Sequence, residues 1–360
     1  MHWRLVSPKA WRVILGATLA LAVVIPASAQ QVAQVQQTRT LIPADSSAGA
    51  RYMDIMDVDQ QANLMYFGDS YRGGVDIWDV SGPNPIYVTT VGNDSGGAGG
   101  VIVAKNVNKV FAGEHPIGVG VIDIDPSSST FNKQIKAIPT GGSADEIDYD
   151  SADMKVYVAH RNEGFVAAID AVNLVVVNTI TGLGGALEQP RYNAGDGYVY
   201  DISGTDNVVY RIDPKTDTLV QTFDIGDPCN PSGLAINPKT NQGILSCRNV
   251  ADQHAVFWDM EAGQVIGSTH ATGGGDSIVY DAKVDRFFEG NDRFPDGSNT
   301  VPGSAPNVGI FTGTPIAYLT SVPATNASHS VTYGETSNMI YTPYIDNGRP
   351  GILSFPLPTH

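Results

Sequence analysis

The chain has 360 residues, of which 37 are acidic and 21 are basic, so its formal net charge is −16. Nucleic acids and anionic lipid surfaces are bound by clustered Lys and Arg, and this acidic balance argues against both as partners. Glycine (39 residues) and proline (22 residues) are abundant, and no long stretch repeats its apolar residues with a helical period. These features predict an all-β chain with many turns.

The first 29 residues have the pattern of a secretory signal peptide. A start with three basic residues is followed by an apolar run over 13–26 and by Ala-Ser-Ala at 27–29, which fits a cleavage site. The apolar run is shorter than the roughly 20 residues that a membrane span needs, and an uncleaved anchor is the alternative. We therefore expect residues 30–360 to form one soluble, monomeric domain without a membrane span, either periplasmic or secreted.

Two marker strands recur along the chain after a lone strand predicted at 38–43 (TRTLIP). The first marker ends in a small or polar residue and occurs at 64–68 (LMYFG), 109–113, 155–159, 197–201, 243–247, 286–290 and 339–343. The second mostly ends in Asp and occurs at 75–79 (VDIWD), 119–123, 166–170, 209–213, 255–259, 308–312 and 352–356. Seven units with a period of about 45 residues are typical of β-propeller blades.

Each unit also carries an apolar strand before the first marker and a fourth strand after the second. The clearest unit has β-branched and aromatic strands over 155–159, 165–170 and 175–180, separated by short polar turns. The last unit lacks a fourth strand before His360, whereas 38–43 is a strand to spare. The sequence therefore predicts a seven-bladed β-propeller of four-stranded antiparallel blades, closed by an N-terminal strand that completes the last blade.

Two stretches of the chain resemble a known repeat family. VYVAHRNEGFVAAIDAVNLVVVNTI (156–180), with DPCNPSGLAINPKTNQ (227–242) downstream, is similar to the YVTN-repeat family of exported β-propellers. The resemblance covers most of residues 45–356 and is best in the third and fifth units. It implies the fold and export, but it names no activity, because members of the family bind diverse ligands. The sequence departs from the family pattern at two places. In the third unit His160 stands where the family usually has Asn, and in the fifth unit Arg248 follows Cys247 at the corresponding position.

In a propeller the starts of the first strands and the ends of the second strands meet on one face, around the central channel. The polar residues at these positions, which we call the rim, are Asp54, Asp69, Arg72, Glu114, His115, Asp145, Glu146, His160, Arg161, Gln189, Arg191, Ser232, Arg248, Asp276, Asn291, Asp292, Arg293, His329 and Tyr344. Ionisable groups that converge on a concave face predict a ligand pocket. The alternative is that they pair with one another and close the channel.

Three rim histidines are candidates for a metal site or for acid–base chemistry. His115, His160 and His329 could hold Zn²⁺ or Cu²⁺ and leave one coordination position open. One of them could instead be a general base that Glu114 or Asp145 orients. The alternative is that these histidines are only hydrogen-bonded at the starts of loops. The cofactor therefore stays open, with Zn, Cu and Ca as the divalent metals considered.

The other candidate residues would bind a ligand rather than a metal. Arg161, Arg191 and Arg248 could hold an anionic group. Asp276 is a further acid–base partner at the rim, and Tyr344 is a further ligand contact.

The two cysteines also fall on the rim face. Cys229 precedes a first strand and Cys247 ends the adjacent second strand, and in an exported protein such a pair favours a disulfide. Copper ligation or a reactive thiol is the alternative. The glycine-rich stretches at 96–100 and 273–275 lack the Lys of a phosphate-binding loop and are predicted to be inter-blade loops, and 293–307 is an insertion.

Three classes of function remain compatible with the sequence. The first is an exported propeller that binds a small molecule or a protein partner at the polar rim. The second is a metal-assisted lyase or hydrolase with its site at the channel mouth. The third is a copper-dependent redox protein. No motif in the chain names a ligand or a reaction.

Overall fold

The computed structural model describes residues 33–44, 53–92, 97–114, 116, 118–249, 251–294 and 306–359. The chain divides into two units, Met1–Gln30 and Gln31–His360, and all described residues belong to the second. The expected signal peptide and His115 therefore lie outside the described residues.

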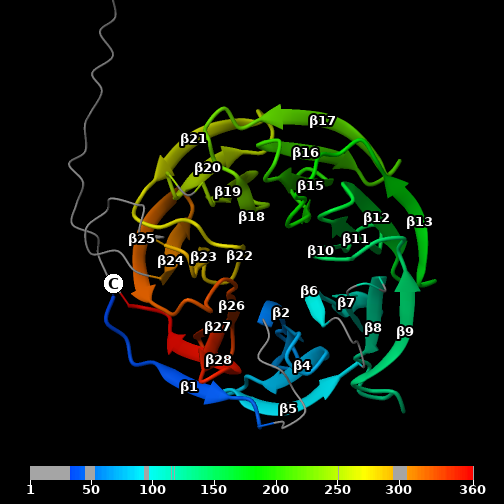
Figure 1. The fold of residues 1–360 in the computed structure, drawn as a ribbon, viewed down its shortest axis with the longest axis vertical. Helices are drawn as coiled ribbons and strands as arrows, with labels where there is room; N and C mark the ends of the chain where they lie inside the picture. The colour runs from blue at the N-terminus through cyan, green and yellow to red at the C-terminus, as the bar shows by residue number, and fades with distance from the viewer. Residues whose placement is uncertain are drawn as a thin grey trace, which may run out of the picture. The chain divides into compact units, whose positions relative to one another are not determined.

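The described residues form 28 strands in seven sheets of four antiparallel strands, which are arranged as the blades of a ring (Figure 1). Blade 1 comprises β2 (Met53–Asp59), β3 (Leu64–Asp69), β4 (Gly74–Asp79) and β5 (Ile86–Val91). Blade 2 comprises β6 (Ala98–Ala104), β7 (Lys109–Glu114), β8 (Gly118–Asp123) and β9 (Lys133–Pro139). Blade 3 comprises β10 (Ile147–Asp150), β11 (Lys155–His160), β12 (Phe165–Asp170) and β13 (Val175–Ile180).

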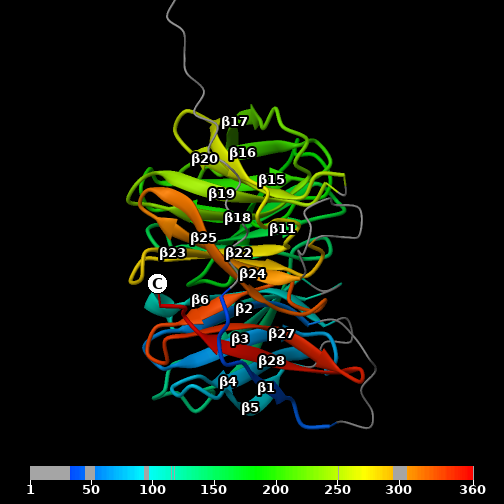
Figure 2. The same cartoon turned by 90° about the vertical axis from the view of Figure 1, so that its left-hand side faces the viewer.

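The remaining blades follow in chain order, as the colours of Figure 1 show, and Figure 2 shows the same ring from the side. Blade 4 comprises β14 (Arg191–Asn193), β15 (Tyr198–Ser203), β16 (Val208–Asp213) and β17 (Thr218–Asp224). Blade 5 comprises β18 (Pro231–Asn237), β19 (Gln242–Cys247), β20 (His254–Asp259) and β21 (Gln264–Thr269). Blade 6 comprises β22 (Ser277–Asp281), β23 (Arg286–Asn291), β24 (Asn307–Gly313) and β25 (Ile316–Pro323). Blade 7 comprises β26 (Thr332–Gly334), β27 (Met339–Asp346), β28 (Arg349–Pro356) and β1 (Thr38–Leu41).

This architecture confirms the predicted all-β class and the seven four-stranded blades. In blade 7, β1 runs antiparallel to β28, with Thr38 opposite Ser354 and Leu41 opposite Gly351. That this strand holds the ring closed stays a prediction, which the Discussion tests. The only helical segment among the described residues is the 3₁₀ turn η1 (Lys105–Val107), so no helix there is long and apolar enough to cross a membrane.

The recurring Asp of the second marker has a structural cause. Asp170 ends β12, and its Oδ1 accepts hydrogen bonds of 2.8 Å from the backbone N–H groups of Val172 and Asn173 in the following turn. Asp259 does the same at the end of β20, where it accepts from Glu261 at 3.0 Å and Ala262 at 2.9 Å. Carboxylates that satisfy turn donors in this way fix where these third strands end.

The hydrophobic core is divided among the blade interfaces. The described residues form seven clusters, one between each pair of neighbouring blades. Between blades 3 and 4, for example, the buried Tyr157 and Val166 pack with Val199 and Ile212. Burial of this apolar surface, at roughly 25 cal/mol per Å², drives the sheets to stack face to face.

Side chains of the innermost strands link one blade to the next across the channel wall. Asp57 in β2 accepts a hydrogen bond of 2.8 Å from the backbone N–H of Val103 in β6, and Asp148 in β10 accepts one of 2.6 Å from Tyr192 in β14. Since the first strand of each blade has no partner strand on its channel side, these carboxylates satisfy backbone donors that would otherwise be unpaired.

Cys229 and Cys247 form a disulfide, which confirms the predicted pairing. Both residues are fully buried in the interface between blades 4 and 5. The bond joins the segment that enters β18 to the end of β19, and so it fixes the rim of blade 5 beside the channel.

Candidate functional site at the channel mouth

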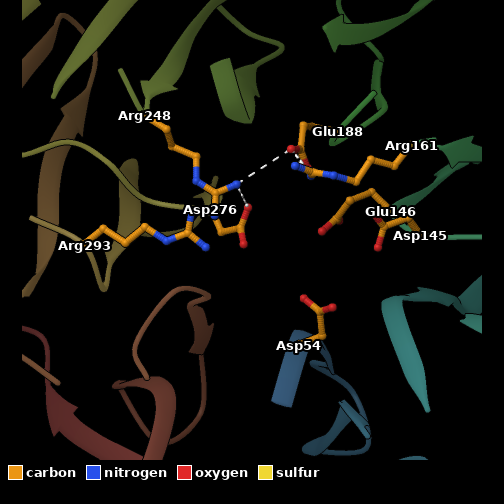
Figure 3. A pocket seen from close by; sticks show the side chains of 8 residues that line it. All are labelled: Asp54, Asp145, Glu146, Arg161, Glu188, Arg248, Asp276 and Arg293. Carbon is orange, nitrogen blue, oxygen red and sulfur yellow. Dashed lines mark hydrogen bonds and ion pairs between the residues drawn. The ribbon is translucent and has the colours of Figure 1, made fainter. Parts of the chain in front are cut away.

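A cavity of about 230 Å³, which we call the acidic cavity, lies at the rim and is lined only by charged residues (Figure 3). Its lining residues are Asp54, Asp145, Glu146, Arg161, Glu188, Arg248, Asp276 and Arg293. They come from five different blades, so no short sequence motif could encode the cavity. Asp145, Arg161, Arg248 and Asp276, four of the candidate residues, meet here.

Arginine and carboxylate groups pair on one side of the acidic cavity. Arg248 Nη1 lies 2.8 Å from Asp276 Oδ1 and 3.7 Å from Glu188 Oε1, and the guanidinium of Arg161 donates to the same Glu188 oxygen (Figure 3). Burial by itself would raise the pKa of Asp276, but Arg248 and the other nearby cations hold that pKa below its ordinary value. Burial and the negative charge of Asp276 raise the pKa of Glu188 well above its ordinary value despite Arg161 and Arg248, so the ionised pair on this side of the cavity is Arg248 with Asp276.

The other side of the cavity is rich in carboxylates. Burial, with the negative charges of Asp54 and Asp145, raises the pKa of Glu146 well above its ordinary value. Glu146 is 4% exposed, and its Oε2 has no hydrogen-bond partner among the described residues. Burial also raises the pKa of Asp54, whose Oδ1 lies 3.7 Å from Nε2 of the buried His329. A cation entering here would relieve the repulsion among these groups.

A second cavity of about 300 Å³, which we call the basic cavity, adjoins the first. The two cavities share Arg161, Glu188, Arg248 and Arg293. The rest of the basic cavity consists of uncharged residues from blades 4 and 5, so three arginines face a single carboxylate there. In the acidic cavity the same arginines face five carboxylates. The composition of the channel mouth is thus polarised: carboxyl groups outnumber arginines on one side, and arginines outnumber carboxyl groups on the other.

Two of the candidate residues point away from the channel. His160 is fully buried: Nε2 is 2.7 Å from Thr140 Oγ1, Nδ1 is 3.2 Å from the Val158 carbonyl oxygen, and the ring stacks on Phe165. Burial lowers the pKa of His160. Glu114, also buried, accepts a hydrogen bond of 3.0 Å from the Gln134 side chain. Neither lines the acidic or the basic cavity.

Two further candidates lie elsewhere. Arg191 lines a third cavity of about 250 Å³, further along the innermost strands, together with Asp57 and Asp148. Tyr344 lies in β27, and the guanidinium of Arg39 sits over its ring at 5.1 Å from the centroid. The structure therefore does not bring Arg191 or Tyr344 together with Arg161 and Arg248.

The proposed set of three metal-binding histidines stays untested, because His115 lies outside the described residues. Of the other two, His160 has protein partners at both ring nitrogens, whereas His329 lies against Asp54. Burial would lower the pKa of His329, but Asp54 and the other nearby carboxylates raise it. In the part of the chain that the structure describes, one group of three potential metal ligands occurs (Asp252, His254 and His270), and none of its members lines the acidic or the basic cavity.

Glu188 was missed in the sequence, although a signal for it exists. Its backbone N–H donates to Ile202 O, and the N–H of Asp145 donates to Ala159 O. Ile202 and Ala159 are the fifth residues of β15 and β11, so Glu188 and Asp145 occupy equivalent positions in consecutive blades. An alignment of the repeats that extended further before each first strand would have found this acidic pair.

Comparisons with known proteins support the fold and no more. No protein-family model matches this chain, so the YVTN resemblance stays a prediction. A search of curated proteins found no match. One similar solved structure is a crystal structure of the mitotic checkpoint complex, with a TM-score of 0.66 and 12% identity over 97% of this chain and 99% of that chain. As 1556 chains of solved structures match the fold, the fold alone cannot distinguish among functions.

Proposed function

We propose that this protein is an exported β-propeller that binds a small zwitterionic molecule at the mouth of its central channel. The carboxylate or phosphate of the ligand would face Arg161 and Arg293 in the basic cavity, and its ammonium group would face Asp54 and Glu146 in the acidic cavity. Export is supported by the N-terminal sequence and is compatible with the disulfide, since disulfides persist in oxidising compartments such as the periplasm.

The polarised pair of cavities is the observation that carries this proposal. Five carboxylates line one cavity and only one lines the other, while the same three arginines border both. A diacid would add negative charge beside Glu146 and Asp54, and a diamine would add positive charge beside the arginines. A ligand with one charge of each sign satisfies both sides at once.

Three four-carbon compounds with different end groups test this proposal: 4-aminobutyrate, succinate and putrescine. Isothermal titration calorimetry at pH 7 should show that 4-aminobutyrate binds more tightly than succinate and putrescine. If the charged groups of the site lie further apart than the two ends of 4-aminobutyrate, one of its longer homologues, 5-aminovalerate or 6-aminohexanoate, should bind most tightly. Equal affinity for the three four-carbon compounds, or binding of none of these five probes, would contradict the proposal.

Variants locate the site. Arg293→Gln changes a side chain that is 48% exposed, so it should leave the fold intact while weakening 4-aminobutyrate binding about tenfold, the cost of one charge-assisted hydrogen bond. Asp54→Asn should weaken the ammonium contact to a similar extent. Arg349→Gln removes a positive charge in the β27–β28 hairpin, outside both cavities, and should leave the affinity unchanged.

The lyase or hydrolase alternative is a second candidate, and Glu146 is the residue that favours it. A buried carboxylic acid with a raised pKa beside arginines has the properties of a general acid. Assays with a panel of 4-nitrophenyl esters and 4-nitrophenyl glycosides would test it. Turnover that is present in the wild type and lost in Glu146→Gln supports this class, and equal turnover in both proteins refutes the role of Glu146.

A further inference from the structure

A second polar cluster lies on the rim face of blade 5, outside the channel mouth. Asp252, His254 and His270 each offer one ligand atom, and these atoms all lie within 4.8 Å of one another. They come from the β19–β20 loop, the start of β20 and the β21–β22 loop. Asp227, in the β17–β18 loop, approaches the same cluster through its carboxylate. None of the four residues lines the acidic or the basic cavity.

The hydrogen bonding of His254 determines which of its nitrogens can bind a cation. Nδ1 lies 2.8 Å from the backbone carbonyl oxygen of Asp252. A carbonyl oxygen can only accept, so Nδ1 carries the hydrogen and the lone pair of the neutral ring is on Nε2. In metal-binding histidines, one ring nitrogen usually donates its hydrogen to a backbone carbonyl or a carboxylate, and the other ring nitrogen binds the metal.

The available nitrogen of His254 faces a group that cannot donate to it. Nε2 is buried and has no hydrogen-bond partner among the described residues, and Asp227 Oδ2 lies 3.3 Å away. A lone pair that faces a carboxylate oxygen is unfavourable unless a positive charge lies between them. The His254 ring is 0% exposed, so bulk water does not reach Nε2, whereas the Asp227 side chain is 37% exposed.

His270 and Asp252 complete the cluster from the solvent side. His270 Nε2 lies 2.9 Å from Asp252 Oδ1, and the His270 ring stacks on the His254 ring with their centroids 5.0 Å apart. The side chains of His270 and Asp252 are 53% and 47% exposed. They can therefore turn toward an incoming ion, whereas His254 is fixed.

The glycine-rich stretch at 273–275 explains why His254 is held in place. Gly273 has φ of +147°, and a Cβ on it would lie 2.4 Å from the backbone nitrogen of His254. Only glycine allows the loop to blade 6 to pass this close over His254 and bury it. The stretch is part of an inter-blade loop, as the sequence predicted, and it also packs against the cluster.

We propose that Asp252, His254 and His270 bind one divalent transition metal ion such as Zn²⁺ or Cu²⁺, with Asp227 placed to supply a fourth ligand. Two imidazoles and carboxylates form a ligand set that suits these ions. The metal would supply the missing positive charge between His254 Nε2 and the Asp227 carboxylate, and the Asp252 carboxylate, whose Oδ2 lies 4.0 Å from His254 Nδ1, would turn with His270 to reach the ion. This site is independent of the ligand proposed at the channel mouth.

Metal titration of the full exported chain tests this site. After treatment with a chelator, calorimetry should show one Zn²⁺ bound per chain. His270→Ala removes an exposed side chain, should preserve the melting temperature of the metal-free protein, and should weaken Zn²⁺ binding about tenfold or more. Asp252→Asn is a second variant with the same expectation. Asp346→Asn removes an exposed carboxylate in the β27–β28 hairpin and should leave Zn²⁺ affinity unchanged.

Cu²⁺ provides a readout of the ligands themselves. Electron paramagnetic resonance of the Cu²⁺-loaded protein should show coupling to two imidazole nitrogens, and His270→Ala should lose one of them. Zn²⁺ affinity that is unchanged in both His270→Ala and Asp252→Asn would overturn the proposal. So would the absence of saturable binding of either ion.

Discussion

Glu289 should make the propeller less stable as the pH rises toward neutrality. It is fully buried in β23, where its Oε1 accepts a hydrogen bond of 2.5 Å from Ser246 of the neighbouring blade. Burial raises the pKa of Glu289 from 4.5 to about 7, despite hydrogen bonds from Ser246, Asn291 and Thr272 that favour the ionised form. The folded protein therefore keeps this proton at pH values where the unfolded chain has lost it.

The pKa difference gives the size and the direction of the effect. Below pH 4.5 both states are protonated and the contribution to stability is fully present, and it is lost as the pH rises through about 7. At 1.36 kcal/mol for each pKa unit, the loss amounts to about 3 kcal/mol. Asp57, whose pKa burial raises to about 6, acts in the same direction. The wild type alone therefore does not isolate Glu289.

Urea unfolding of the wild type and of Glu289→Gln, each at pH 4.5 and pH 8, isolates the contribution of Glu289 to the pH dependence of stability. The neutral amide removes the titration, so the free energy of unfolding of the variant relative to wild type should rise by about 3 kcal/mol between the two pH values. Glu261→Gln, at an exposed turn after β20, is the matched control and should show no such rise. A relative change for Glu289→Gln below about 0.5 kcal/mol, or of opposite sign, would refute the reasoning.

Three further predictions concern the interactions that stabilise the blades and hold them together. Replacing both Cys229 and Cys247 by Ala should lower the free energy of unfolding by about 3 kcal/mol, measured by urea unfolding, because the disulfide closes a loop with a sequence separation of 18 residues. A loss below about 1 kcal/mol would contradict this. Deleting residues 31–43 should expose the edge of β28 and remove Ile42 from its cluster, so that size-exclusion chromatography shows dimers or larger species. A monomer with an unchanged melting temperature would show that β1 does not close the ring. Asp170→Ala should cost about 1 kcal/mol, because two turn N–H groups lose their acceptor, and an unchanged urea midpoint would refute that role.

The ring itself was predictable because each blade repeats the same local physics. Strands over 165–170 and 175–180 have the predicted bounds, since β-branched runs end at turns whose donors an Asp satisfies. The period of the repeats then determined the number of blades. The cysteine pairing followed from the same register, because it placed Cys229 and Cys247 on one face of adjacent strands.

The direction of each rim side chain was not predictable from its position in a loop. His160 and Arg161 are neighbours, yet His160 is buried against Thr140 and Arg161 lines the cavity. β11 ends at His160 and Arg161 begins the turn that follows, so a single residue separates a packed side chain from one that lines the cavity. His160 and Glu114 each end the second strand of their blade, and both are buried. The residue after this position is the better candidate for a site, as Arg161 and Arg248 illustrate.

The central claim is that the polarised channel mouth binds a zwitterion, and a crystal structure with 4-aminobutyrate tests it most directly. Crystals of protein purified without added ligand would be soaked in the compound, and its density located in a difference map. The account predicts one molecule across the two cavities, with the carboxylate at Arg161 and Arg293 and the ammonium at Asp54 and Glu146. A channel mouth that stays empty at saturating concentrations of 4-aminobutyrate, 5-aminovalerate and 6-aminohexanoate, or a molecule in the reverse orientation, would contradict the claim.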